Sequence, residues 1–139
     1  MKIYFACSIT GGREFESVYQ AIVHALTENG YSVLTAHLVE SNAMEVEAAL
    51  GPEYVYIRDT DWVRECDVLI AEVSIPSHGV GYEVGFALGI GKPVLALHRE
   101  DRKISKMISG NPDENLTVKT YSTTEEAIRA ALQFLSNRG

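Results

Sequence analysis

Strand-like and helix-like segments alternate about five times along this chain, and this alternation constrains the fold more than any other feature. Short runs rich in β-branched and aromatic residues occur at residues 2–7, 31–35, 67–73, 94–98 and 116–121. Segments with helical spacing of apolar residues, or with helix cap signals, follow them at residues 15–29, 54–65, 80–90, 104–109 and 127–135. Such alternation implies right-handed crossovers, which build a parallel sheet with helices on both faces.

We therefore predict one α/β domain over residues 1–139, doubly wound and Rossmann-like (flavodoxin-like), with a five-stranded parallel sheet. The length suits one compact domain, and no linker divides the chain. Residues 36–52 lack a strong period, so we expect a mobile loop there that can include a helical turn. Because binding crevices in such sheets lie beyond the carboxyl ends of the strands, we look for chemistry in the loops after the first three strands.

Charge and apolar patterning exclude several classes of partner. Twelve Lys and Arg against nineteen Asp and Glu give a net charge of −7 without a basic stripe, so we expect no polymeric nucleic acid partner. No apolar run approaches the roughly 18 to 20 residues that span a bilayer, and no signal-peptide pattern follows Met1, so we expect a cytoplasmic protein without a membrane partner. Cys7 and Cys66 lie in apolar segments without CxxC spacing, which favours reduced core thiols over zinc ligands.

The first strand ends in a glycine-containing loop. Its residues are Ser8, Ile9, Thr10, Gly11, Gly12 and Arg13. Backbone N–H groups here meet the positive end of the next helix dipole, which suits a phosphate or another anion. The loop has neither the Lys-Ser/Thr pair of a Walker sequence nor a GxGxxG fingerprint, and a plain strand-to-helix turn explains it equally well.

Three side chains near the expected crevice are candidates for acid, base or nucleophilic chemistry. Glu83 follows two glycines at the start of the expected helix 80–90, and those glycines leave room against the backbone. A carboxylate in this position also serves as a simple partner of the helix dipole. Asp59 lies on the preceding helix, where a solvated surface charge is the commoner explanation. Tyr4 lies in the first strand and either fills the core or points its hydroxyl into the crevice.

Four histidines are present, and residue type alone selects none of them as functional. His37 follows the second strand and is placed to face the crevice, and His78 lies in the loop after the third strand. The other two have no special setting. Locally, Ser105 is explained as a helix cap and Met107 as a hydrophobic contact.

Six segments together resemble a known family. They are YFACSITGGR (4–13), LTAH (34–37), DTDW (59–62), the strand 67–73, PSHGVGYE (76–83) and SKMI (105–108). In order and spacing they closely resemble the 2'-deoxynucleoside 5'-phosphate N-hydrolases (N-glycosidases) of the nucleoside deoxyribosyltransferase superfamily. The resemblance implies a hydrolase that splits a nucleoside monophosphate into free base and sugar 5-phosphate, with no cofactor and no metal.

The resemblance assigns catalytic roles to four residues. Glu83 matches the family nucleophile, which attacks the anomeric carbon in a retaining scheme. Asp59 matches the acid/base carboxylate and His37 a histidine near the base, and both remain candidates for the main proton donor. Tyr4 matches a tyrosine that holds the nucleophile or the sugar.

A second group of residues matches substrate-binding positions. Ser8 and Ser77 match residues that hold the 5-phosphate, joined by backbone groups of the first loop and of Gly79. Ser105, with Met107 nearby, matches a contribution from the neighbouring subunit, so the resemblance implies a homodimer with shared sites. Deoxyribosyltransferases act on unphosphorylated nucleosides and have no need of such a serine cradle, which favours hydrolysis.

Two positions depart from the vertebrate members of that family, which carry Gly at Cys7 and Arg at Thr10. Loss of a guanidinium is expected to weaken phosphate affinity or to change base and sugar preference. Three alternatives therefore stay open. They are a deoxyribosyltransferase that passes the same glycosyl ester to a second base, a ribonucleotide glycosidase acting on substrates such as CMP, and a non-catalytic nucleotide- or FMN-binding module.

Overall fold

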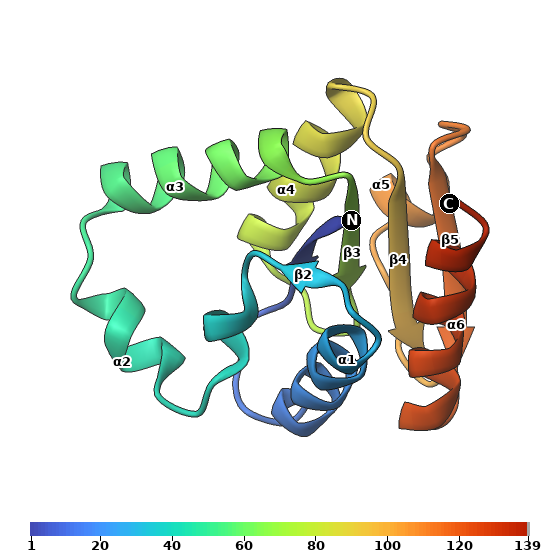
Figure 1. Ribbon diagram of the computed structural model, residues 1–139, viewed down its shortest axis with the longest axis horizontal. Coiled ribbons are helices and arrows are strands. Elements are labelled where there is room, and N and C mark those ends of the chain that lie inside the picture. The colour runs from blue at the N-terminus through green and yellow to red at the C-terminus, as the bar shows by residue number, and fades with distance from the viewer. Residues whose placement is uncertain (139) are drawn as a thin grey trace.

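Five parallel strands form one sheet in the order β2-β1-β3-β4-β5 (Figure 1). The structure, a computed structural model, describes residues 1–138. The strands are β1 (Lys2–Ala6), β2 (Ser32–Val33), β3 (Val68–Glu72), β4 (Val94–Arg99) and β5 (Leu116–Tyr121). This order, with every neighbouring pair parallel, confirms the predicted doubly wound, flavodoxin-like sheet.

Helices cover both faces of the sheet. They are α1 (Glu16–Glu28), the 3₁₀ helix η1 (Ala36–Val39), α2 (Ala43–Ala48), α3 (Pro52–Glu65), α4 (His78–Gly89), α5 (Lys106–Ser109) and α6 (Thr124–Ser136). Helices α1 and α6 pack together against one face, and α3 and α4 pack together against the other (Figure 1). Two layers arise because the chain winds in opposite directions from the centre of the sheet.

Side chains of β1 alternate between the two layers. Ile3 and Phe5 pack with the α1 and α6 layer, and Tyr4 and Ala6 face α3 and α4. All of β3 is buried, as expected for a central strand covered on both faces. Both cysteines are buried and free, as predicted. The alternation directs Tyr4 into the layer that contains α4.

The second strand is shorter than the sequence predicted. A strand was expected over residues 31–35, but β2 comprises only Ser32 and Val33. The buried Thr35 explains the early end, because its hydroxyl accepts from the Phe5 N–H at 3.0 Å and donates to the Phe5 carbonyl at 2.7 Å. A side chain thus takes the place of the backbone ladder at the edge of the sheet.

The prediction of a mobile loop over residues 36–52 is wrong in part, because η1 and α2 both lie within this segment. The segment is also tied to the rest of the molecule. Gln20 donates to the Val39 carbonyl at 2.9 Å, and Arg58 pairs with Glu47 of α2. Helical pieces this short have little stability of their own, so these tertiary contacts hold the segment in place.

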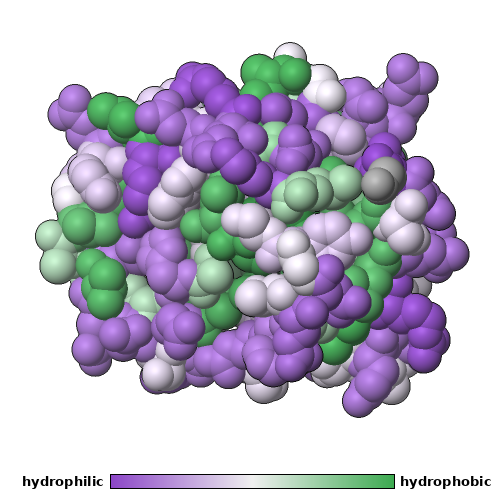
Figure 2. All heavy atoms as spheres, viewed as in Figure 1, coloured by the Kyte–Doolittle hydropathy of each residue, from purple (hydrophilic) through white to green (hydrophobic). Residues whose placement is uncertain are grey.

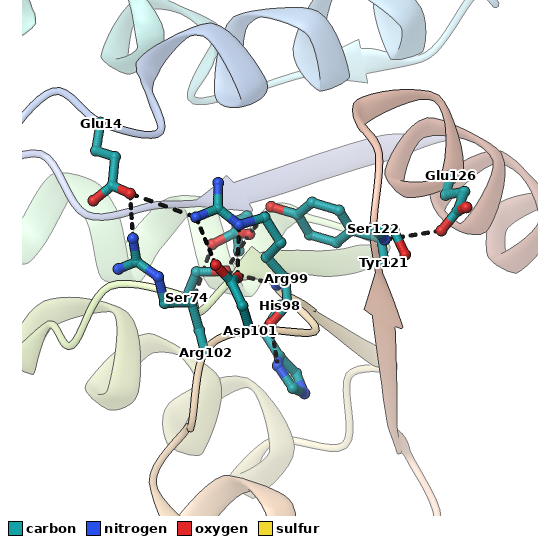
Figure 3. Close-up of polar contacts among 10 residues, drawn as sticks. Glu14, Ser74, His98, Arg99, Asp101, Arg102, Tyr121, Ser122 and Glu126 are labelled. Carbon is teal, nitrogen blue, oxygen red and sulfur yellow. Dashed lines mark hydrogen bonds and ion pairs between the residues drawn. The ribbon is translucent and has the colours of Figure 1, made fainter.

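A fully buried carboxylate, Glu72, ends β3 on the α1 and α6 side. Ser74 donates to it twice, from its backbone N–H at 2.7 Å and its hydroxyl at 2.8 Å, and the Tyr121 hydroxyl donates as well. The Ser74 oxygen in turn accepts from the Arg99 N–H at 2.9 Å (Figure 3). Burial raises the pKa of Glu72, whereas the bonds from Tyr121 and Ser74 lower it. The network fixes the start of the loop that leads to Ser77.

We expect Tyr121→Phe to destabilise the protein by about 1–3 kcal/mol, because the buried Glu72 loses one of its donors while the ring stays in place. Denaturant unfolding followed by circular dichroism measures this change. The control is Tyr54→Phe, which removes a hydroxyl from an exposed tyrosine and should leave the midpoint unchanged. Equal stability of the two variants would contradict a stabilising role for the Tyr121 bond.

Polar side chains dominate the surface seen in Figure 2, with hydrophobic side chains showing between them. Within residues 1–138, no helix combines the length and the apolar character needed to cross a membrane.

Candidate active site

The loops after β1 and β3 meet where the winding of the sheet reverses. These two strands are neighbours at the centre of the sheet, and their carboxyl ends face the same edge. At Gly11 a Cβ would overlap both the Ser8 hydroxyl and the side chain of Ile75 in the other loop. A glycine is therefore required for the two loops to approach each other. The two loops therefore adjoin each other at the edge of the sheet where the topology predicted a binding crevice.

Tyr4 and Glu83 come together from two different elements, β1 and α4. Tyr4 is fully buried in β1, and its hydroxyl donates to Glu83 Oε2 on α4. Ser77 caps α4 by accepting from the Val80 N–H at 3.3 Å. That cap fixes where the helix begins, and Glu83 in the second turn reaches the Tyr4 hydroxyl.

Burial raises the pKa of Glu83 to about 8, from an ordinary value of 4.5. A carboxyl group loses solvation when it is enclosed, and this disfavours the charged form. The Tyr4 hydroxyl opposes the effect, because a donated hydrogen bond favours the carboxylate. Glu83 is therefore a half-enclosed carboxyl group with perturbed proton affinity, which is a common property of catalytic residues.

Asp59, Gly79 and Glu83 line one hollow of about 160 Å³ between α3 and α4. The other residues that line it are Tyr56, Thr60, Val63, Tyr82 and Phe86. A Cβ built on Gly79 would lie 3.8 Å from Glu83 Oε1, so the glycine keeps the space beside that carboxyl group free of a side chain. Two carboxyl groups from two helices thus share a small cavity with aromatic walls.

Asp59 is not the solvated helix charge that its position in the sequence suggested. Its carboxylate accepts from Arg58 Nε at 2.9 Å, and only 21% of its side chain is exposed. Burial raises the pKa of Asp59, the Arg58 hydrogen bond and charge lower it, and the nearby Glu47 charge raises it. The side chain is therefore held in place by a fixed ionic partner.

His37 lies in η1 and is exposed. Its ring packs edge-on against Trp62, with ring centroids 5.4 Å apart. His37 lines neither the Glu83 hollow nor the hollows beside Ser8 and beside Ser105. Its charge lowers the pKa of Asp59. The structure thus brings His37 into the electrostatic environment of Asp59 while leaving its ring outside these hollows.

The first loop lines a second hollow of about 150 Å³. Ser8, Ile9, Gly12 and Arg13 contribute to it, together with residues of α1, η1 and α2. Gly12 has a φ of 101°, a left-handed conformation that favours glycine. Arg13 is exposed and pairs with Glu16, and Thr10 is also exposed.

Ser77, Ser105 and Met107 line a third hollow of about 610 Å³ beside α4 and α5. Met107 is 83% exposed. Ser8, Ser77 and Ser105 share one geometry, because each hydroxyl oxygen accepts a backbone N–H two or three residues further along the chain, from Gly11, Val80 and Met107. An accepting hydroxyl still has its own hydrogen to donate.

Sequence reasoning missed three residues around the two carboxyl groups. Tyr56 and Phe86 line the Glu83 hollow, and Glu47 pairs with Arg58. Tyr56 precedes Asp59 by three positions and Phe86 follows Glu83 by three, which places each pair on one face of its helix. That spacing was a usable signal for the two aromatic residues. Glu47 had none, because its partner lies on another element.

Across the described residues, no group of three or more His, Cys, Asp or Glu side chains is arranged to hold a metal ion.

Sequence and structure comparisons identify relatives. The chain matches the nucleoside 2-deoxyribosyltransferase family over residues 3–130. It is 42% identical to a Thermofilum pendens protein named 2'-deoxynucleoside 5'-phosphate N-hydrolase 1, over 92% of this chain and 90% of the relative. It is 40% identical to the mouse 5-hydroxymethyl-dUMP N-hydrolase, over 94% of this chain and 76% of that protein.

The fold also matches a solved structure, the CMP N-glycosidase of Clostridium botulinum. The TM-score is 0.76 at 21% identity, over 96% of this chain and 99% of that one. The family match covers nearly the whole chain, and the sequence relatives share about two residues in five with it. The chain therefore belongs to the nucleoside 2-deoxyribosyltransferase family.

Proposed function

We propose that this protein hydrolyses the N-glycosidic bond of 2'-deoxynucleoside 5'-monophosphates, releasing the free base and 2-deoxyribose 5-phosphate. The observation that carries the proposal is that Glu83, whose carboxyl group accepts from the buried Tyr4 hydroxyl, lines one hollow with Asp59. Relatives named as N-hydrolases of deoxynucleotides, at 40–42% identity over most of the chain, support the substrate class.

Glu83 is the nucleophile in this proposal. As its oxygen bonds to C1' of the sugar, the bond from C1' to the base nitrogen breaks and the electron pair leaves with the base. Asp59 donates the proton that the departing base takes up. Water then attacks C1', Asp59 accepts the proton of that water, and the ester bond breaks to restore the Glu83 carboxylate. A 2-deoxy sugar suits this route, because positive charge at C1' is better tolerated without a 2-hydroxyl group.

Ser8, Ser77 and the backbone of residues 9–13 bind the 5-phosphate in this proposal, with Gly79 beside them. Their loops adjoin each other at Gly11, and both hydroxyls are oriented by backbone N–H groups. Hydroxyls and amides bind phosphate without a salt bridge, so an acidic chain of net charge −7 is compatible with the substrate.

A panel of nucleotides assayed for liberated base tests the proposal. We expect release from deoxynucleoside monophosphates, and little from the corresponding deoxynucleosides. Faster release from CMP than from dCMP would identify a ribonucleotide glycosidase instead. Base exchange between a deoxynucleoside and a foreign base would identify a transferase. Tight binding of nucleotide or FMN with no release from any compound would contradict an enzyme of this class.

We further propose that the protein is a homodimer in which Ser105, with Met107 nearby, completes the phosphate site of the partner subunit. Met107 and the neighbouring Tyr82 are both more than half exposed, and a second copy would cover them. Ser105 also shares a hollow with Ser77 of its own chain, so contributions within one chain and across two chains are both sterically open.

Ser105→Ala should raise KM for the phosphorylated substrate several-fold, with little change in kcat, because one donor to the phosphate is lost. A hybrid dimer shows whether Ser105 acts in the site of its own chain or in the site of the partner subunit. Mixing Ser105→Ala with Glu83→Gln chains creates one site that has Glu83 from one chain and Ser105 from the other. Wild-type KM in that mixture supports the shared site, whereas the KM of Ser105→Ala alone, or an active monomer, contradicts it.

A further inference from the structure

Arg58 connects Asp59 to α2, a helix that does not line the Glu83 hollow. Its Nε donates to Asp59 Oδ1 at 2.9 Å, and its two terminal nitrogens donate to both carboxylate oxygens of Glu47 on α2, with Nη1 at 3.1 Å from Oε2. The side chains of Arg58 and Glu47 are only 12% and 15% exposed. All three donor nitrogens of the guanidinium are therefore engaged by two enclosed carboxylates.

Aromatic rings fix the guanidinium in this position. Arg58 lies over the Trp62 ring at 5.0 Å from its centroid and near the Tyr54 ring at 5.9 Å. Trp62 also meets the His37 ring. A planar guanidinium stacked on aromatic rings and forked to carboxylates has little freedom to turn, and a lysine ammonium could not reproduce this set of contacts.

We infer that Arg58 is a positioning residue that holds the Asp59 carboxyl group toward the Glu83 hollow, and that Glu47 limits how strongly Arg58 attracts the Asp59 carboxylate. The inference rests on the proposed role of Asp59 as proton donor and acceptor. Nothing in the function proposed above assigns a role to either Arg58 or Glu47.

The chemistry explains why the arginine needs a second partner. Asp59 must release a proton to the departing base and then take one from water, so neither of its forms can be strongly favoured. An arginine alone favours the carboxylate and makes the acid form scarce. Because Glu47 forms a forked pair with the same guanidinium, its negative charge offsets part of the attraction between Arg58 and the Asp59 carboxylate.

The charged and titratable groups that face Asp59 come from four elements. Arg58 lies on its own helix, Glu47 on α2, His37 on η1 and Glu83 on α4. Tyr56 and Tyr82 complete the walls of the hollow. Arg58 lowers the pKa of Asp59 and Glu47 raises it. Removing these two charges should therefore move that pKa in opposite directions.

Carboxyl-carbon NMR titration of Asp59 in the ligand-free protein measures this effect. We expect Arg58→Gln to raise the apparent pKa by about 1 pH unit and Glu47→Gln to lower it by a smaller amount. The matched control is Arg64→Gln, which breaks the exposed pair with Asp61 on the same helix and should shift nothing. Unchanged titration in both variants, or shifts in the same direction, would overturn the inference.

Kinetics with two leaving groups provide the second readout. In Arg58→Gln, release of an ordinary base should slow at least several-fold, while release of an activated leaving group that needs no proton should stay close to wild type. Equal slowing of both would overturn the positioning role. If Arg58→Gln does not fold, Glu47→Gln decides by the direction of its shift. The titration needs no substrate, so it distinguishes a failure of this inference from a failure of the proposed reaction.

Discussion

Replacing Glu83 by Gln should lower base release from deoxynucleoside monophosphates by on the order of 10,000-fold or more, because an amide cannot form the glycosyl ester. The substitution keeps the size of the side chain, so the hollow shared with Asp59 should keep its shape. Steady-state release of free base, followed by chromatography, measures the loss. Activity within tenfold of wild type would mean that another group attacks C1'.

The pH dependence gives this prediction a second, independent check. Burial raises the pKa of Glu83 to about 8, and only the carboxylate is nucleophilic. On the acid side, kcat/KM should therefore rise with pH until Glu83 is ionised. Tyr4→Phe removes a donor that favours the carboxylate, so its acid limb should lie at higher pH than that of the wild type. An acid limb unmoved by Tyr4→Phe would contradict this assignment.

The pH dependence of the free energy of unfolding shows whether Glu83→Gln loses activity without losing its fold. The pKa of Glu83 is 4.5 when unperturbed and about 8 in the folded protein, so the unfolded chain releases its proton first as pH rises. The contribution of this group to folding is fully present below pH 4.5 and is lost as pH rises through 8. Glu83→Gln should lack this loss and should be the more stable protein at alkaline pH. If Glu83→Gln were instead less stable than the wild type at alkaline pH, its loss of activity could come from unfolding.

The sheet could be predicted from the sequence because each central strand carries its own signal. Residues 67–73 are almost continuously apolar, which a strand buried on both faces requires, and β3 lies there. The edge strand and the segment after it could not be predicted as well. β2 ends early because Thr35 bonds to Phe5, thirty positions away, and α2 is tied to the fold through Glu47 and Arg58. Neither contact leaves a periodic pattern.

The candidate site, like the fold, could be predicted from the sequence only in part. Topology indicated which loops meet, and the adjoining loops at Gly11 lie where it pointed. Local context misjudged Asp59, because a charge on a helix says nothing about what packs over it. The contact between Tyr4 and Glu83 joins residues 79 positions apart, one on β1 and one on α4. Such a contact follows from packing, which no single segment encodes.

Asp59→Asn should slow release of an unactivated base by about 100- to 10,000-fold, the usual contribution of a general acid. The amide is nearly isosteric with the carboxylate and can still accept from Arg58, so we expect a folded protein with similar KM. Release from a substrate whose leaving group needs no proton should suffer much less in its first step. Equal losses for both substrates would show that Asp59 does not donate the proton.

The same experiment on His37 decides between the two candidate donors. His37 is exposed and its ring lies against Trp62, outside the hollow that Asp59 shares with Glu83, so His37→Ala should cost far less than Asp59→Asn with the unactivated base. The reverse ranking would make His37 the donor and would leave Asp59 to activate water in the second step. Because hydrolysis of the ester needs a base whatever the leaving group, Asp59→Asn should then accumulate the glycosyl ester on Glu83, which mass spectrometry of the intact protein detects as a mass increase equal to the bound sugar phosphate.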